Sequence, residues 1–397
     1  MKIGIVTTWF ERGAAYVSRQ YMELFEAHGV ETFIYARGGE RQARGDRNWD
    51  GPNVTWAKPS YVPGAGTLDR KDFLGWIRRN AIAVVLFNEQ HWMPAVLWAR
   101  DAGVLTLAYI DYYTEKTIPL HAAYDGLVCN TRRHLSAFDW HPQCKYIPWG
   151  TDLRVFTASA PTSGPGTEGC VFFHSAGMSP CRKGTDLAIE AFSRMKHSAR
   201  ARLVIHTQVE LGREFPGLAG LVAELERQGR LTVIHRDVTA PGLYHLGDVY
   251  VYPSRLEGVG LTQAEALACG LPIITPDNPP MSEFVSSESG LAVPVAKYWS
   301  RFDGYYWPMC QVDVEALADA MDQYAATADI GALKRKARAY AEENLDWFIN
   351  GEPLLEWVRG LVRTELAPAL RSQILVSFPP DSLWYWFRGR LKGILGV

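Results

Sequence analysis

Two glutamates eight positions apart, Glu257 and Glu265, stand beside a glycine-containing loop in the stretch 248–283. Gly258 and Gly260 let backbone N–H groups approach a ligand closely, and a helix starting after them carries partial positive charge at its N-terminus. This combination suits a phosphate group. Because an acid would repel a phosphate, we expect the two carboxylates to accept hydrogen bonds from hydroxyls on two different rings of a nucleotide-sugar.

The elements around this pair are predicted to be strand, loop, helix and strand. The β-branched and aromatic run 249–252 predicts a buried strand that Pro253 ends. An apolar-periodic helix is expected over about 261–268, ended by Gly270, and residues 271–275 predict the next strand. Glu257 would then lie on the loop and Glu265 inside the helix.

The segment PSRLEGVGLTQAEALACGLP resembles the E-x7-E signature of retaining glycosyltransferases of family 4. A bare pair of glutamates at this spacing is a weak signal, but the surrounding residues and elements make it specific. The resemblance runs from Lys2 to about Glu365. It implies an α/β protein of GT-B fold, with two facing doubly wound parallel-sheet (Rossmann-like) domains and a cleft between them. The alternative is a purely structural parallel-sheet crossover in which the two acids are solvated and bind no ligand.

Length and composition agree with two domains in one enzyme-sized chain. The 397 residues are 47% hydrophobic, enough for two cores, and the net charge of -2 gives no general attraction to nucleic acid. Six cysteines without metal-ligand spacing predict reduced thiols, with no zinc site and no disulfide framework. The N-terminal apolar run is too short for a signal peptide, and no apolar run reaches membrane-spanning length, so we expect a cytoplasmic protein.

Alternating strand and helix patterns divide the chain. We predict an acceptor-binding Rossmann-like domain over 1–156 and a linker rich in Ala, Pro, Ser, Thr and Gly over 157–169. A nucleotide-sugar-binding Rossmann-like domain follows over 170–350, and residues 351–397 hold a crossover helix and a basic, aromatic tail. The polar segment 37–49 is predicted to be a mobile loop.

In the first domain, candidate residues follow the strands at their carboxyl ends, where ligands bind in such sheets. Four aromatic residues could stack on an acceptor sugar or could be ordinary core residues: Trp9, Trp92, Tyr112 and Tyr113. Gly13 matches one glycine of a pair that the family uses to close over the donor diphosphate. Where the family often has a histidine near the donor sugar, this chain has Ile110. We therefore consider His91 and Asp111 as catalytic candidates, although a lone histidine is more often structural.

In the second domain, AGMSPCRKG resembles the family segment G-R-x-x-x-x-K-G, whose Arg and Lys hold the diphosphate. Lys183 matches the lysine, Met178 replaces the arginine, and Arg182 is a possible substitute donor ligand. The resemblance also brings Arg236 near the nucleotide base. Glu283, in PPMSEFV, is expected either to bind donor hydroxyls or to act as a cap.

The resemblance implies a role for each residue in a retaining, metal-independent transfer of a hexose from a UDP- or GDP-sugar co-substrate, without other cofactors. Glu257 would fix the donor sugar and Glu265 the ribose. Lys183 would stabilise the diphosphate together with backbone N–H groups of the loop and helix start: Gly258, Val259, Gly260, Leu261 and Thr262. The acceptor would be a glycan or a lipid-linked glycan.

Two segments lie outside the resemblance. The aromatic insertion 297–310 could cover the expected cleft. The tail 382–397 mixes Trp, Tyr and Phe with three basic residues, a profile typical of helices at an anionic membrane surface. The alternative for the tail is a helix docked on the first domain. The sequence predicts no oligomeric state.

Three other functions stay open at this point. A glycoside hydrolase also uses two carboxylates but needs no phosphate site. A nucleotide-sugar epimerase could share the GT-B fold. A non-catalytic GT-B protein that only binds the donor or a partner would explain Ile110 and Met178 at the positions where the family has histidine and arginine.

Overall fold

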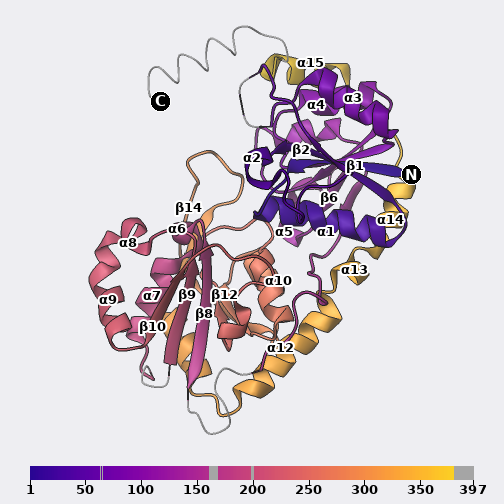
Figure 1. Cartoon of the computed structure of the whole chain (residues 1–397). Helices are drawn as coiled ribbons and strands as arrows, with labels where there is room; N and C mark the ends of the chain where they lie inside the picture. Colours follow the sequence, from indigo (N-terminus) through magenta and orange to yellow (C-terminus); the bar gives the residue numbers. More distant parts are fainter. Residues whose placement is uncertain (63, 65, 161–168, 198–200, 380–397) are drawn as a thin grey trace. The chain divides into compact units, whose positions relative to one another are not determined.

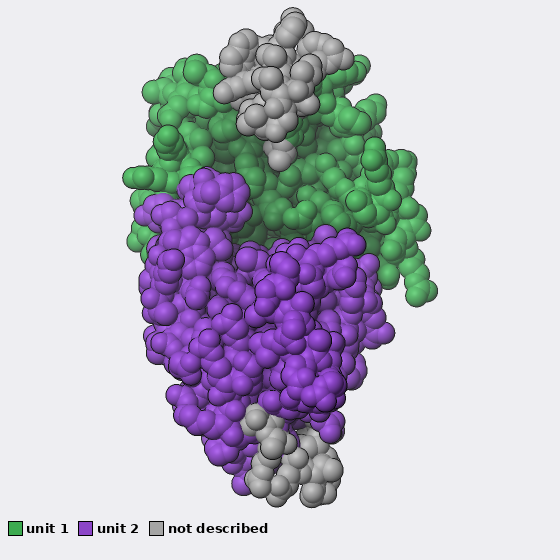
Figure 2. Space-filling model, turned by 90° about the vertical axis from the view of Figure 1, so that its left-hand side faces the viewer, with its two compact units in different colours: residues 1–130, 134–147, 351–397 green, residues 131–133, 148–350 purple. Residues whose placement is uncertain are grey.

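The computed structural model describes residues 1–62, 64, 66–160, 169–197 and 201–379. The chain forms two compact α/β units (Figures 1 and 2). Unit 1 contains residues 1–130, 134–147 and 351–397, and unit 2 contains residues 131–133 and 148–350. The predicted tail at 382–397 and most of the predicted linker lie outside the described residues. No helix in the described part of the chain has the length and apolarity needed to cross a membrane.

Unit 1 is built on a parallel seven-stranded sheet with the order β3-β2-β1-β4-β5-β6-β7. The central strand β4 (Val84–Asn88) is buried along its whole length, as expected for a strand covered by helices on both faces. The remaining strands are β1 (Lys2–Thr8), β2 (Glu31–Gly38), β3 (Val54–Trp56), β5 (Leu105–Tyr109), β6 (Gly126–Cys129) and β7 (Cys144–Tyr146). The helices are α1 (Gly13–Ala27), α2 (Glu40–Ala43), α3 (Arg70–Asn80), α4 (Pro94–Asp101), α5 (Arg132–Phe138), α14 (Glu352–Arg359) and α15 (Pro368–Ser377).

The segment 37–49 differs from the predicted mobile loop. It contains the short helix α2, and Trp49 at its end is buried. The Trp49 ring packs edge-to-face against Trp9 at a centroid distance of 5.2 Å. The polar composition of the segment led to the prediction of a mobile loop. One buried aromatic side chain is nevertheless enough to attach a short segment to the core.

Unit 2 has a parallel six-stranded sheet with the order β10-β9-β8-β11-β12-β13. Its strands are β8 (Cys170–Gly177), β9 (Ala201–Thr207), β10 (Leu231–His235), β11 (Val249–Val251), β12 (Ile273–Pro276) and β13 (Gly290–Val293). The helices are α6 (Pro180–Lys183), α7 (Thr185–Arg194), α8 (Leu211–Glu214), α9 (Ala219–Arg227), α10 (Leu261–Ala268), α11 (Val314–Ala325), α12 (Ile330–Asn344) and α13 (Trp347–Asn350). The aromatic insertion forms an antiparallel hairpin of β14 (Val295–Trp299) and β15 (Met309–Val312).

The boundary between the units falls earlier than residue 156. Residues 148–156 group with unit 2 because they are bonded to the segment around α13. The Thr151 N–H donates to Leu345 O at 2.8 Å, and the Trp347 N–H donates to Thr151 O at 3.1 Å. The rings of Trp149 and Trp347 are 4.9 Å apart. Residues 351–379, which include the predicted crossover helix, group with unit 1.

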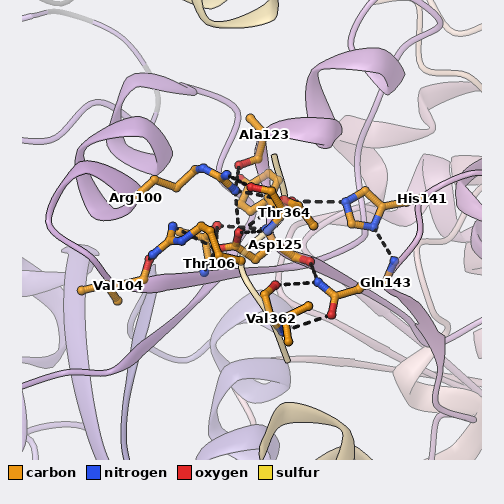
Figure 3. A network of polar contacts seen from close by, with 11 residues as sticks. Arg100, Val104, Thr106, Ala123, Asp125, His141, Gln143, Val362 and Thr364 are labelled. Carbon is orange, nitrogen blue, oxygen red and sulfur yellow. Dashed lines mark hydrogen bonds and ion pairs between the residues drawn. The ribbon is translucent and has the colours of Figure 1, made fainter. Parts of the chain in front are cut away.

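The C-terminal segment is attached to unit 1 through a buried carboxylate, Asp125 (Figure 3). Asp125 is fully buried at the amino end of β6. Its Oδ1 accepts from Arg100 Nη1 at 2.6 Å and from the Thr364 N–H at 3.0 Å. Its Oδ2 accepts from the Thr106 N–H at 2.9 Å and lies 3.2 Å from Arg363 Nη1. Both oxygens are therefore occupied by donors from unit 1 itself.

Candidate functional site

The donor-side cluster of unit 2 consists of Arg182, Lys183, Tyr252, Ser254 and Glu257. Arg182 and Lys183 lie on α6, and this helix ends at Gly184, which has a left-handed φ of +71°. A Cβ on Gly184 would lie 2.1 Å from Pro253 O, so only glycine lets the two loops approach this closely. The Arg255 N–H then donates to Arg182 O at 2.8 Å. The two cationic residues on α6 are thus held beside the loop that follows β11.

Glu257 is the centre of the cluster, and its donors converge on a single oxygen. Glu257 Oε1 accepts from Arg182 Nη1 at 2.7 Å and from Ser254 Oγ at 2.5 Å, and Lys183 Nζ lies 2.9 Å away. Burial alone would raise the pKa of Glu257, but the two cations outweigh it and lower that pKa to about 2. The side chain is therefore a carboxylate at any physiological pH.

Lys183 is positioned by an aromatic residue as well as by this carboxylate. Its Nζ donates to Tyr252 OH at 2.7 Å and lies 4.7 Å from the centre of the Tyr252 ring. Burial lowers the pKa of Lys183 to about 8 although Glu257 opposes the shift. An ammonium group in this position can bind a phosphate and compensate charge that develops on a leaving group.

The predicted loop and helix start are present beside the cluster. Gly260 precedes α10 with a φ of +91°, and Leu261 and Thr262 form the first turn of the helix. On the same helix, Glu265 Oε2 accepts from Tyr244 OH at 2.5 Å. Burial raises the pKa of Glu265. Each of the two predicted carboxylates therefore has one oxygen held by the protein, and among the described residues no donor contacts the other oxygen.

Three donor-side predictions have different outcomes. Arg236 has an exposed side chain, while its backbone N–H donates to Thr207 O at 3.1 Å. The Glu283 carboxylate accepts from the backbone N–H groups of Arg132 at 2.7 Å and Arg133 at 2.9 Å. Both of its oxygens are engaged by backbone, so the structure favours the capping role over donor binding. Arg182 is paired with Glu257, as described above.

In unit 1, three of the four predicted acceptor-binding aromatic residues are core residues. Trp9, Trp92 and Tyr113 are 2%, 5% and 0% exposed. Trp92 packs edge-to-face on Trp98, and Tyr113 OH lies 2.9 Å from His134 Nδ1. A sugar ring needs an open aromatic face, so the stacking prediction is wrong for these three. Gly13 is the first residue of α1.

The other unit 1 candidates lie at the carboxyl ends of adjacent strands. The exposed His91 ring packs edge-to-face on half-buried Tyr112, with 5.1 Å between ring centres. Burial and the neighbouring Glu89 carboxylate raise the pKa of Asp111 well above its usual value. Arg37 Nη2 donates to Glu89 O at 2.7 Å. His91 and Asp111 therefore remain catalytic candidates, and Tyr112 remains a candidate for contact with an acceptor.

Several residues of these two sites were absent from the sequence-based set: Arg37, Glu89, Tyr244, Tyr252 and Ser254. Two of them carried a usable signal. Glu89 directly follows β4, and Ser254 comes three residues after β11, positions at which open α/β sheets bind ligands. The two tyrosines carried no such signal. A tyrosine that only packs in the core and one whose hydroxyl contacts a site residue have the same local sequence pattern.

Two parallel doubly wound sheets of this kind define the GT-B architecture, and known structures agree. A glycosyltransferase from Rickettsia africae superposes with a TM-score of 0.70 at 17% identity, covering 91% of this chain and 99% of that one. The Anabaena protein HepE, solved with UDP and glucose, superposes with a TM-score of 0.68 at 14% identity, covering 91% and 100%. At these identities the likeness shows the fold alone.

Sequence comparison adds family information for unit 2. Residues 169–326 match the family described as Glycosyl transferases group 1. A GDP-mannose-dependent monoacylated alpha-(1-6)-phosphatidylinositol monomannoside mannosyltransferase of Corynebacterium glutamicum is 29% identical, over 56% of this chain and 58% of its own length. The lipopolysaccharide core biosynthesis mannosyltransferase LpsB of Rhizobium meliloti is 32% identical, over 30% of this chain and 35% of its own. The chain thus spans less than two thirds of either relative.

Proposed function

We propose that this chain transfers a sugar, with retention of anomeric configuration, from a UDP- or GDP-linked donor to a hydroxyl of a glycan or glycolipid acceptor. The observation that carries the proposal is the donor-side cluster. An ammonium group and a carboxylate lie beside the start of α10, in a segment that matches Glycosyl transferases group 1, and no residue in the described part of the chain contacts the second oxygen of that carboxylate. A hydrolase would have no use for the lysine and the helix start.

In the proposed mechanism, Lys183 and the backbone N–H groups at the start of α10 bind the diphosphate. They stabilise it more strongly as its bond to the anomeric carbon breaks, which is the contribution that accelerates the step. Glu257 holds hydroxyls of the donor sugar and Glu265 holds the ribose. The acceptor hydroxyl attacks the anomeric carbon from the face that the diphosphate leaves and passes its proton to the departing phosphate oxygen, which accounts for retention. Lys183 and the start of α10 compensate the charge of the diphosphate in place of a metal ion.

The donor and acceptor classes are proposed from the relatives. GDP-mannose is the first donor to test because the Corynebacterium relative is named for it, and UDP-glucose is the second because HepE was solved with UDP and glucose. Both sequence relatives are named for glycolipid or lipopolysaccharide synthesis, so a lipid-linked acceptor is the first choice.

The test is a thermal-shift screen of nucleotide-sugars followed by a turnover assay with each donor that stabilises the protein. We expect stabilisation by at least one UDP- or GDP-sugar and release of the nucleoside diphosphate that depends on an acceptor. Conversion of the donor without an acceptor would favour an epimerase, and release of free sugar from a glycan without nucleotide would favour a hydrolase. Binding without turnover on any acceptor would favour the non-catalytic alternative.

We also propose that residues 382–397 bring the protein to an anionic membrane, as their sequence suggests. Sedimentation with vesicles containing phosphatidylglycerol, compared with vesicles of phosphatidylcholine alone, tests this. A triple variant with Gln at Arg388, Arg390 and Lys392 should lose the difference between the two vesicles. Equal binding of the wild type to both would contradict the proposal.

A further inference from the structure

We propose that Arg182 is a positioning residue that orients Glu257 toward the donor sugar, and that it is not a ligand of the diphosphate. This inference rests on the proposed function of the donor-side cluster. Of the two adjacent cationic residues, Arg182 would act at the sugar end of the donor and Lys183 at the diphosphate end.

Arg182 fixes both the loop and the carboxylate with one nitrogen. Its Nη1 donates to Leu256 O at 2.7 Å and to Glu257 Oε1 at 2.7 Å. The backbone of the same residue is also engaged, because Arg182 O accepts from the Arg255 N–H at 2.8 Å and from Ser254 Oγ at 3.2 Å. The arginine is therefore attached to the β11–α10 loop through its backbone and through its guanidinium group.

The convergence of donors determines which oxygen of Glu257 remains for a ligand. Arg182 Nη1, Ser254 Oγ and Lys183 Nζ all lie within 2.9 Å of Oε1. No donor in the described part of the chain contacts Oε2. A carboxylate held in this way presents Oε2 in a single orientation, so hydroxyl groups that bind it need not reorient the side chain.

The charges of Arg182 and Lys183 also favour a positioning role for Arg182 and a diphosphate-binding role for Lys183. The Arg182 guanidinium is neutralised by the Glu257 carboxylate, which raises the pKa of Arg182. Lys183 has a second partner, the neutral Tyr252 hydroxyl, and can exchange its contact with Glu257 for a phosphate oxygen. Met178, at the position where the resemblance expects the phosphate-binding arginine, is 72% exposed. Within the donor-side cluster, Lys183 is thus the side-chain cation that remains for the diphosphate.

The first experiment compares Arg182→Gln with Lys183→Gln by titration calorimetry with UDP and GDP and by turnover of the donor. We expect Arg182→Gln to change the nucleotide Kd by less than about 3-fold. We expect it to lower kcat by roughly 30-fold or more, because the variant no longer holds Glu257 in one orientation toward the sugar. Lys183→Gln should weaken nucleotide binding by about 10-fold or more. Arg182→Lys should recover only part of kcat, since an ammonium group does not reproduce the guanidinium geometry.

A second measurement tests the role of Arg182 without a donor. If no donor is found, the proposed function fails, but this test of Arg182 still applies. In protein labelled with 13C at the Glu side-chain carboxyls, the Glu257 resonance, assigned with Glu257→Gln, is followed against pH. We expect Arg182→Gln to raise the pKa of Glu257 from about 2 toward its ordinary value, and Arg182→Lys to raise it less. An unchanged Glu257 titration would overturn the proposal. So would a loss of nucleotide affinity in Arg182→Gln as large as in Lys183→Gln, with kcat unchanged.

Discussion

Asp125 in unit 1 and Glu257 in unit 2 are both buried carboxylates that lie beside two cationic side chains, but their hydrogen bonds differ. Asp125 in unit 1 lies at the amino end of β6, with both oxygens bound by donors of its own unit (Figure 3). Glu257 in unit 2 follows the carboxyl end of β11, with three donors gathered on Oε1. In open α/β sheets the carboxyl ends of the strands bind ligands. We therefore assign a structural role to Asp125, and we propose a ligand-binding role for Glu257, whose Oε2 no described residue contacts.

The cations differ in the same way. Arg100, the partner of Asp125, has a side chain that is 6% exposed, whereas the Arg182 side chain is 37% exposed. If its carboxylate is removed, Arg100 stays buried without a counter-charge, but Arg182 can turn toward water. The same kind of substitution should therefore affect stability in unit 1 and function in unit 2.

The largest expected effect is on stability in unit 1. Asp125→Asn should lower the free energy of unfolding by about 3–5 kcal/mol, because it leaves the buried Arg100 guanidinium unpaired. Urea denaturation measures this. The matched control is Asp101→Asn, which removes an exposed pair with Arg371 and should cost less than about 1 kcal/mol. Equal losses in the two variants would mean that Asp125 does not anchor the C-terminal segment.

The second prediction concerns function in unit 2. Glu257→Gln should lower turnover by about 10²- to 10³-fold, the range for removing one preorganised polar contact to a transition state. Its free energy of unfolding should change by less than about 2 kcal/mol, because the freed Arg182 is partly hydrated. Steady-state kinetics and urea denaturation are run on the same samples. Asp125→Asn, assayed where it is folded, should keep its kcat. A loss of turnover in Asp125→Asn together with unchanged turnover in Glu257→Gln would contradict the two roles.

The third prediction is a pH dependence that only unit 2 should show. The pKa of Lys183 is lowered to about 8, so the ammonium group is present below pH 8 and is lost as the pH rises. Affinity for UDP or GDP should be constant from pH 6 to 7.5 and fall above pH 8, by up to about tenfold per pH unit. Lys183→Arg keeps its charge and should remove the break. A break that persists in this variant would assign the titration to another group.

The smallest expected effect tests the second carboxylate. Tyr244→Phe removes the hydroxyl that holds Glu265 Oε2 and should weaken nucleotide binding by about 3- to 10-fold, the effect of one hydrogen bond to a charged group. The matched control is Tyr35→Phe in unit 1, which removes a 2.9 Å bond to Asp72 far from the donor-side cluster along the chain. Calorimetry with UDP and GDP should show no change for Tyr35→Phe. Equal weakening in both would indicate a general loss of stability.

The sequence by itself determined the alternation of strands and helices and the local elements that carry Glu257, Lys183 and Glu265. Each of these features depends on hydrophobic periodicity and on glycines and prolines at fixed offsets, within about 30 residues of the residue concerned. It could not separate the core aromatics Trp9, Trp92 and Tyr113 from ligand-facing ones, because burial depends on neighbours contributed by other segments.

Only the tertiary structure decided the partners of the charged side chains. Thr364 reaches Asp125 across 239 residues, Arg182 reaches Glu257 across 75, and Glu283 is occupied by backbone from 150 residues away. A charged group makes its contacts through short-range geometry, and no local pattern encodes which distant donor arrives within 3 Å of it. For this reason the motif could name Glu257 and leave Arg182 as a possible substitute ligand, while their pairing and the remaining oxygen of Glu257 required the folded chain.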